Sequence, residues 1–138
     1  MLYANESPSL RLKLLLIELL RRRLPQERPA LQRLNAVTDY IHNHLTNPLS
    51  NSELAKVANY HPYYLNRLML RYNGQTLHSY VTLCRLNSAA ERLLYSSECI
   101  EQVGQECGFL NQAYFTACFK KQFGVTPTNY RKQNSRPL

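Results

Sequence analysis

Glycine is scarce in this sequence. Four glycines among 138 residues leave few positions for the tight turns that join short strands, and no segment alternates apolar and polar residues along the length of a strand. The apolar residues, 44% of the chain, recur instead at intervals of three and four, which is the period of a helix that buries one face. The sequence therefore predicts an all-α fold.

Metal-binding motifs are also missing. No two of the four cysteines are separated by two or four residues, and the four histidines are scattered, so we expect no metal site. The thiols have mostly apolar neighbours and no secretion signal, which indicates reduced, buried cysteines in a cytoplasmic protein; a disulfide framework is the alternative. The cysteines are Cys84, Cys99, Cys107 and Cys118.

The longest apolar run, Leu10–Leu24, is too short to cross a membrane, and charged residues interrupt it. No small-residue cleavage site follows it, so it does not resemble a signal peptide. We expect a leucine-rich helix with an apolar stripe, and then a proline-marked linker at residues 25–30. Leu12, Leu16 and Leu19 would present this stripe to a copy of the chain or to a missing domain; folding back onto the following helices is the alternative.

Acidic residues are too few to balance the basic ones. Seventeen lysines and arginines against nine aspartates and glutamates leave a net charge of +8. A basic excess of this size favours a polyanionic partner, such as nucleic acid or an acidic membrane surface, over a basic protein without such a partner.

Start and stop signals divide the rest of the chain into seven helices. Ser50 and Glu53 form a capping box, and Asn59 suits the left-handed residue that ends the helix they start. Gly74 and Gly124 end two further helices. We expect helices at about residues 31–47, 50–58, 62–72, 77–95, 100–107, 112–123 and 126–131.

The chain contains one supersecondary unit twice. GQTLHSYV at residues 74–81 and GVTPTNYR at residues 124–131 share the pattern Gly-x-Thr-x-x-polar-Tyr. Upstream of the first copy lies the small residue Ala55. The turn residue Asn59 follows it four positions later, and the apolar residue Leu65 lies six positions after Asn59. This spacing is typical of a helix-turn-helix, whose second helix enters the major groove of DNA.

Two residues distinguish the second copy from the first. Cys99 stands where Ser50 caps the first copy, which weakens the start of the helix. Gly104 stands where the first copy has Ala55, at a cost of up to about 1 kcal/mol in helix propensity. We therefore expect the second unit to be the less stable one.

These residues resemble the AraC/XylS family of bacterial transcription regulators. The resemblance covers residues 34–132, and it is most specific at ECGFLNQAYFTACFKKQFGVTPTNYRK, residues 106–132. It implies a seven-helix domain in which a central helix joins two helix-turn-helix units. The leucine-rich helix would precede this domain.

The resemblance also implies how the chain is divided. Residues 1–30 would form the leucine-rich helix and linker, and residues 31–138 the DNA-binding domain. A central helix at 77–95 would join helix-turn-helix units at about 50–74 and 99–124. Its 19 residues span about 28 Å, close to the roughly 34 Å of one DNA turn. The two second helices would then enter successive major grooves of double-stranded DNA.

The second helix of the first unit carries candidates for reading bases. Arg67 could pair with guanine and Asn66 with adenine; contact of Arg67 with phosphate alone is the alternative. These positions resemble the base-contacting positions of the family. The candidates are Tyr63, Asn66, Arg67 and Arg71.

The second helix of the second unit departs from the family pattern. Ala117 stands where the family often has arginine, and alanine can offer only a methyl contact to thymine. This helix would therefore read DNA weakly or mainly hold the backbone. Its base-reading candidates are Asn111, Gln112, Ala113 and Thr116.

Five residues are candidates for contact with DNA phosphates. His61 would cap a helix or bind phosphate, and Arg131 would bind phosphate or bridge to a nearby carboxylate. The lysines suit phosphate contact, with solvated surface charge as the alternative. The five are Ser50, His61, Lys120, Lys121 and Arg131.

The resemblance implies sequence-specific transcription regulation, by activation next to RNA polymerase, with no catalytic residue, metal or cofactor. Two other functions share the fold. Some DNA-repair methyl acceptors carry it with a reactive cysteine, although no cysteine here has a histidine or basic activator near it in sequence. A protein-interaction module that no longer binds DNA is the other, motivated by the alanines of the second unit.

Overall fold

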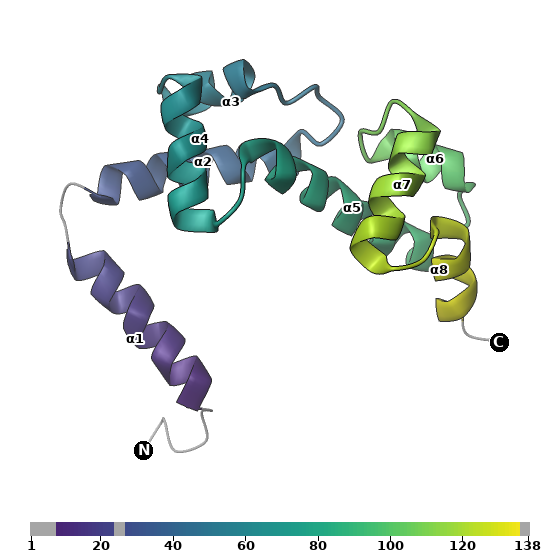
Figure 1. Cartoon of the computed structure of the whole chain (residues 1–138), viewed down its shortest axis with the longest axis horizontal. Helices are drawn as coiled ribbons and strands as arrows, with labels where there is room; N and C mark the ends of the chain where they lie inside the picture. Colours follow the sequence, from purple (N-terminus) through teal and green to yellow (C-terminus); the bar gives the residue numbers. More distant parts are fainter. Residues whose placement is uncertain (1–7, 24–26, 136–138) are drawn as a thin grey trace.

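The computed structural model describes residues 8–23 and 27–135, and every regular element within them is a helix (Figure 1). Helices α2 to α5 surround one hydrophobic core and α5 to α8 a second. The predicted seven-helix domain with a leucine-rich helix before it is confirmed. The helices of this part of the chain are α1 (Pro8–Arg23), α2 (Glu27–Asn43), α3 (Asn51–Ala58), α4 (Pro62–Asn73), α5 (Leu77–Tyr95), α6 (Ile100–Glu106), α7 (Gln112–Phe123) and α8 (Pro127–Asn134).

The repeated Gly-x-Thr pattern stops one helix and starts the next. Gly74 and Gly124, with φ of 74° and 81°, end α4 and α7 in the left-handed conformation that glycine adopts without strain. The hydroxyls of Thr76 and Thr126 then accept a backbone N–H three residues further on and cap α5 and α8. Asn59, with φ 55° and ψ 45°, ends α3 in the same conformation, as the sequence predicts.

Several helix ends differ from the expected positions. α2 begins at Glu27, inside the expected linker, because Pro29 lies in its first turn, where a missing N–H breaks no intrahelical hydrogen bond. α2 also ends earlier than expected, at Asn43, where Nδ1 of His44 donates to the carbonyl of Tyr40 (2.8 Å). α4 and α8 run slightly longer than predicted and α6 slightly shorter, as is usual at helix ends.

The central helix α5 belongs to both hydrophobic cores. Leu77 and Val81, in its first half, pack into the core of the first unit, whereas Leu86 and Leu93 pack into the core of the second. Because one helix supplies both cores, the two units cannot rotate independently without bending α5.

Gly104 of α6 is matched in size to Phe115 of α7. A β-carbon on Gly104 would lie 2.8 Å from Cδ2 and 3.2 Å from Cγ of Phe115. Phe115 is fully buried between Phe109 and Phe119, with ring centroids 4.9 Å and 5.9 Å away, so its ring has no space to move into. The glycine that the sequence marks as a weakness therefore makes room for a larger aromatic side chain in the second core.

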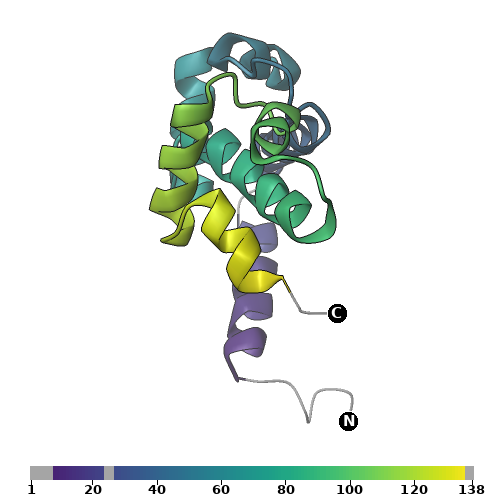
Figure 2. The same ribbon diagram turned by 90° about the vertical axis from the view of Figure 1, so that its right-hand side faces the viewer.

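Helix α1 projects away from both units (Figures 1 and 2). Leu12, Leu16 and Leu19 are 59%, 51% and 57% exposed, so the leucine stripe faces solvent and does not fold back onto α2. Neither α1 nor any other helix in residues 8–23 and 27–135 is long and apolar enough to cross a membrane.

We predict that Gly104→Ala lowers the free energy of unfolding by about 1 kcal/mol, because overpacking against Phe115 outweighs the gain in helix propensity. Urea unfolding followed by circular dichroism measures the change. In a Phe115→Leu background the same substitution should stabilise the protein, since the smaller side chain leaves room for the methyl group. Equal effects of Gly104→Ala in the two backgrounds would contradict the size matching.

Candidate nucleic-acid interface

The second helices of the two units lie on the same side of α5. Figure 1 shows α4 in front of α2 and α7 in front of the second half of α5, the two roughly parallel to each other, and Figure 2 places both at one edge of the molecule. Each follows a short helix, α3 or α6, after a tight turn. One extended ligand can therefore meet both helices at once.

The start of α3 ties the first unit together. The Ser50 hydroxyl accepts the Glu53 N–H (3.1 Å), as the capping box predicts. The Glu53 carboxylate accepts the Leu49 N–H (2.9 Å) with one oxygen and the Tyr40 hydroxyl of α2 (3.0 Å) with the other. The hydrogen bond to Glu53 raises the pKa of Tyr40 above its ordinary value. Glu53 therefore fixes α3 against α2. Because α4 follows α3 after a tight turn, its position depends on this contact.

The exposed face of α4 carries three of its four predicted base-reading residues. Tyr63 is 69% exposed, and Arg67 and Arg71 are also exposed. The guanidinium of Arg67 lies 5.9 Å from the ring centroid of Tyr63, and that of Arg71 lies 5.4 Å from the ring of Tyr72. α4 has no acidic residue, so this face is positively charged.

Asn66, the fourth candidate on α4, faces α5 instead. Its Oδ1 accepts the backbone N–H of Leu77 (2.9 Å), the first residue of α5, and its side chain is half-buried. That N–H has no partner within its own helix, because the first N–H groups of a helix have no carbonyl four residues before them. Asn66 therefore joins α4 to the start of α5 and keeps only its amide NH2 group for another partner, so its role in reading bases stays a prediction.

On α7 the candidates differ in what they can offer, and Gln112 is the one long, exposed side chain among them that caps no helix. Gln112 and Ala113 are exposed, whereas Thr116 is half-buried. Asn111 caps the helix, because its Oδ1 accepts the Tyr114 N–H (2.9 Å), which leaves only its amide NH2 group for another partner. The face of α7 thus offers few hydrogen bonds to bases.

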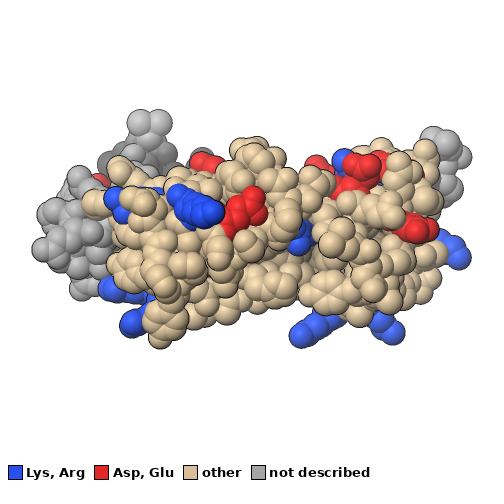
Figure 3. Space-filling model, turned by 90° about the horizontal axis from the view of Figure 1, so that it is seen from above, with Lys and Arg blue, Asp and Glu red and all other residues tan. Residues whose placement is uncertain are grey.

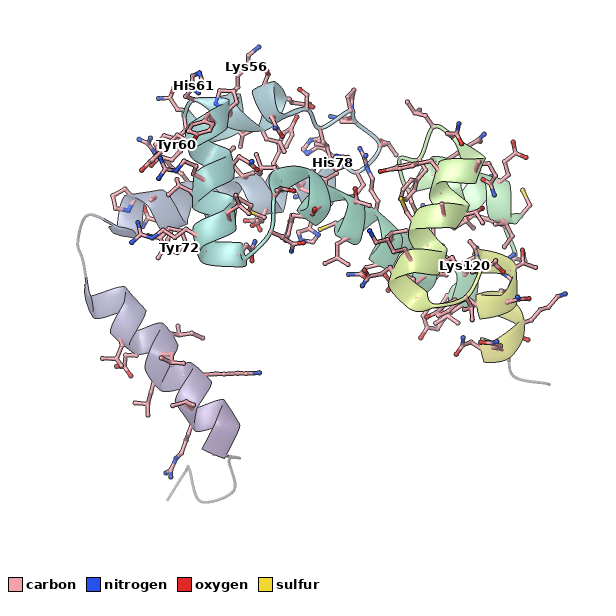
Figure 4. All side chains as sticks on the ribbon, viewed as in Figure 1. Lys56, Tyr60, His61, Tyr72, His78 and Lys120 are labelled. Carbon is pink, nitrogen blue, oxygen red and sulfur yellow. The ribbon has the colours of Figure 1, made fainter. Side chains whose placement is uncertain are left out.

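Four predicted backbone-contact residues are exposed at helix ends. His61 caps α4, since its Nδ1 accepts the Tyr63 N–H (3.2 Å), and its Nε2 can donate to another group. Ser50 lies at the start of α3, and Lys120 and Lys121 lie in the last turn of α7. Figure 4 shows His61 at the upper end of α4 and Lys120 on α7. Seen from above, lysine and arginine side chains project in two groups along one edge, where none of the described acidic side chains is visible (Figure 3).

Arg131, the fifth predicted phosphate contact, is used inside the second unit. Its Nε donates to the carbonyl of Leu93 (3.1 Å) and its Nη2 to the carbonyl of Ser96 (3.3 Å), at the end of α5. The guanidinium satisfies carbonyl groups that the end of a helix leaves without partners. Arg131 therefore has a structural role within the second unit, and its contact with phosphate stays a prediction.

A groove between the two units, lined by both polar and apolar side chains, was not predicted from the sequence. It has a volume of about 430 Å³ and lies between the first half of α5 and one face of α7. Its polar lining includes Gln75, His78, Ser79, Thr82, Lys121 and Gln122, and no carboxylate. The groove is built from residues forty positions apart, so no local motif marks it.

The prediction of buried cysteines is confirmed for Cys84 and Cys107 and is wrong for Cys99, which is exposed, and Cys118, which is half-buried. The structure does place a histidine beside Cys84, which the sequence did not predict: its Sγ lies 4.0 Å from Nε2 of His42. The same Nε2 lies 3.0 Å from the Tyr80 hydroxyl. Burial raises the pKa of Cys84 and of Cys107, which favours the thiol over the reactive thiolate. Within residues 8–23 and 27–135, no group of three or more histidine, cysteine or acidic side chains is placed to hold a metal ion.

Comparison with known proteins agrees with this arrangement. A family described as a helix-turn-helix domain matches residues 54–133, more than half of the chain. The regulatory protein SoxS of Salmonella typhimurium is 30% identical over 100 residues, which are 72% of this chain and 94% of SoxS. The transcriptional activator and DNA repair enzyme AdaA of Bacillus subtilis is 28% identical over 109 residues, which are 79% of this chain and 52% of AdaA.

A solved structure has the same arrangement of helices. The transcriptional regulator from Chromobacterium violaceum, with an AraC-type DNA-binding domain, superposes with a TM-score of 0.73 at 28% identity. The match covers 79% of this chain and 97% of that one. The chain spans about half the length of AdaA and less of several other relatives that it matches.

We predict that Asn66→Ala lowers the free energy of unfolding by about 1–3 kcal/mol, because the Leu77 N–H loses its acceptor. Thermal and urea unfolding measure the loss. Asn73→Ala is the matched control on the same helix, since Asn73 is exposed and makes only a weak contact with the Met69 sulfur (3.5 Å). If the two substitutions were equally mild, the Asn66 hydrogen bond would not stabilise the start of α5.

Proposed function

The chain belongs to the AraC-type family of helix-turn-helix transcription regulators, and we propose that it binds double-stranded DNA with α4 and α7 in successive major grooves. The observation that carries this proposal is the common orientation of the two second helices on one side of α5 (Figures 1 and 2). The 19 residues of α5 span about 28 Å, and one turn of B-DNA spans about 34 Å. A single chain would thus present two reading helices to one face of the duplex.

In this proposal α4 supplies most of the base recognition. Arg67 is exposed and lies beside Tyr63, so it can reach the O6 and N7 atoms of guanine with two hydrogen bonds. Tyr63 and Arg71 flank it on the same face. Contact of Arg67 with a phosphate alone is the competing role, and the substitution described below separates the two.

In this proposal α7 contributes less than α4 to base specificity and more to contact with the DNA backbone. Asn111 and Gln112 offer amide groups to base edges, while Ala113 offers only a methyl group, and Thr116 is half-buried. Lys120 and Lys121, in the last turn, would hold phosphates. In the first unit, Ser50 and His61 would do the same.

The groove between the two units would lie where the DNA backbone passes from one major groove to the next. Its amide, hydroxyl, imidazole and ammonium groups can all donate to phosphate oxygens. The Ser79 hydroxyl already accepts the Thr76 hydroxyl (3.0 Å), so its own proton is available to a further acceptor. The groove would therefore add backbone contacts between the two reading helices.

Regulation would be activation, with RNA polymerase as the protein partner, in line with the name of AdaA. The exposed leucines of α1, Leu12, Leu16 and Leu19, would pair with a second copy of the chain or with a further domain. A DNA-repair methyl acceptor is the less favoured function, because the thiol that has a histidine neighbour, Cys84, is buried and its pKa is raised.

Selection of bound sequences from a random duplex pool at about 150 mM salt tests the proposal. We expect two short motifs whose centres are separated by about one helical turn, or about 10 base pairs. A single motif would mean that α4 alone specifies the site and that α7 only holds the backbone. Enrichment of no sequence would overturn the proposed function and favour an interaction module.

We predict that Arg67→Ala weakens binding to the selected duplex by about 1–3 kcal/mol and relaxes the preference at one base pair. The physical reason is the loss of a two-pronged contact that only guanine satisfies. Fluorescence anisotropy on the selected duplex and on its single-base variants measures both effects. Equal losses on selected and random duplexes would show that Arg67 contacts only phosphate.

Lys120→Ala is the matched contrast to Arg67→Ala, because the ammonium group of Lys120 lies at the end of α7 and not among the proposed base-reading residues. We predict that it weakens binding to all duplexes alike and reduces the slope of log K against log salt concentration by about one. Titrations at several salt concentrations measure the slope. An unchanged slope would remove Lys120 from the interface.

A further inference from the structure

The two units touch at Gly108, outside the helix that they share. Gly108 has a φ of 97° and lies in the turn between α6 and α7. A β-carbon at this position would overlap the carbonyl oxygen of Leu45 and would come within 2.7 Å of Nε of Arg85. Leu45 belongs to the loop between α2 and α3, so the turn of the second helix-turn-helix packs directly on a loop of the first.

Arg85 of α5 holds this contact in place. Its Nε donates to the carbonyl of Leu45 (3.0 Å) and its Nη2 to the carbonyl of Asn47 (2.6 Å). Burial lowers the pKa of the guanidinium, which nevertheless remains a cation at neutral pH. A cation that is half-buried against carbonyl groups fixes their positions, because rotation of the loop would leave the charge without hydrogen-bond acceptors.

The reading helix α7 is attached at the same place on α5. Tyr114 of α7 forms a hydrogen bond with Cys118 that raises its pKa, and burial acts in the same direction. Tyr114 lines the groove between the units together with Thr82 of α5, and α7 packs against α5. α7 is thus anchored to the turn of α5 that carries Arg85.

We propose that Arg85, held between the 45–47 loop and Gly108, is a positioning residue that sets the number of base pairs between the two sequences read by α4 and α7. This role of Arg85 rests on the proposed function. One inserted base pair moves the second site by about 3.4 Å along the duplex and by about 35° around it. A single helix can bend to follow such a change, but two units joined at a second place cannot do so without breaking the contact at Gly108.

Binding to spacer variants of the selected duplex tests this role. For the wild-type chain we expect one inserted or deleted base pair between the two motifs to weaken binding about tenfold or more. For Arg85→Ala we expect this penalty to fall to about threefold or less, together with weaker binding to the original spacing, because a hinged chain adapts to both. An unchanged penalty in Arg85→Ala would overturn the proposal.

Arg131→Ala is the matched control. Arg131 also donates Nε and Nη2 to two carbonyl groups, but these lie at the C-terminal end of α5 and not at the contact between Leu45 and Gly108. It should therefore lower stability as Arg85→Ala does and leave the spacer penalty at its wild-type value. A spacer penalty that falls equally in both variants would show that general loosening, and not the contact at Gly108, is responsible.

A measurement without DNA separates this inference from the proposed function. Residual dipolar couplings of backbone amides in α2–α4 and in α6–α8 should fit one alignment tensor in the wild-type chain and two different tensors in Arg85→Ala. One shared tensor in the variant would overturn the positioning role, whatever the chain binds. If Arg85→Ala does not fold, Arg85→Lys replaces it, because lysine keeps the charge and the stem but cannot make both hydrogen bonds.

Discussion

The arrangement of the molecule depends on one continuous helix that is buried in two cores. Leu77 and Val81 of α5 are covered by the first unit, and Leu86 and Leu93 by the second. Removing apolar surface from water stabilises each core separately, but both share the same rigid backbone. The length of α5 therefore limits how far apart α4 and α7 can lie, and its 19 residues span about 28 Å.

The two apolar cores hold the helices together, and polar contacts fix the orientation of those helices. Asn66 joins α4 to the first turn of α5, and Arg85 joins α5 to the loop after α2. Arg131 closes the end of the same helix in the second unit. Hydrophobic burial is non-directional, whereas hydrogen bonds have a preferred geometry. These hydrogen bonds can therefore define the angle between the two helix-turn-helix units.

Basic and acidic side chains are distributed unevenly over the described surface. Lysine and arginine side chains extend along the edge that α4 and α7 share, whereas acidic side chains lie elsewhere in the same view (Figure 3). A positive face attracts any polyanion, and the selectivity must then come from the few side chains that reach base edges. On this chain α4 presents Arg67 and Arg71 at exposed positions, whereas α7 presents Ala113.

Local patterns in the sequence determined the helices, their caps and the repeat. Asn59, Gly74 and Gly124 adopt the left-handed conformation because their own chemistry permits it, and the threonines that follow the two glycines cap the next helices. Spacing also placed Tyr63, Arg67 and Arg71 on one exposed face of α4.

Only the tertiary structure decided what each polar side chain contacts. Asn66 and Arg131 look like DNA ligands in sequence, but each lies within hydrogen-bond distance of a backbone group that would otherwise lack a partner. Gly104 is unfavourable for helix propensity, but in the structure Phe115 fills the space beside it. Periodicity fixes which side of a helix is exposed, whereas the partner of a side chain depends on segments that are distant in sequence.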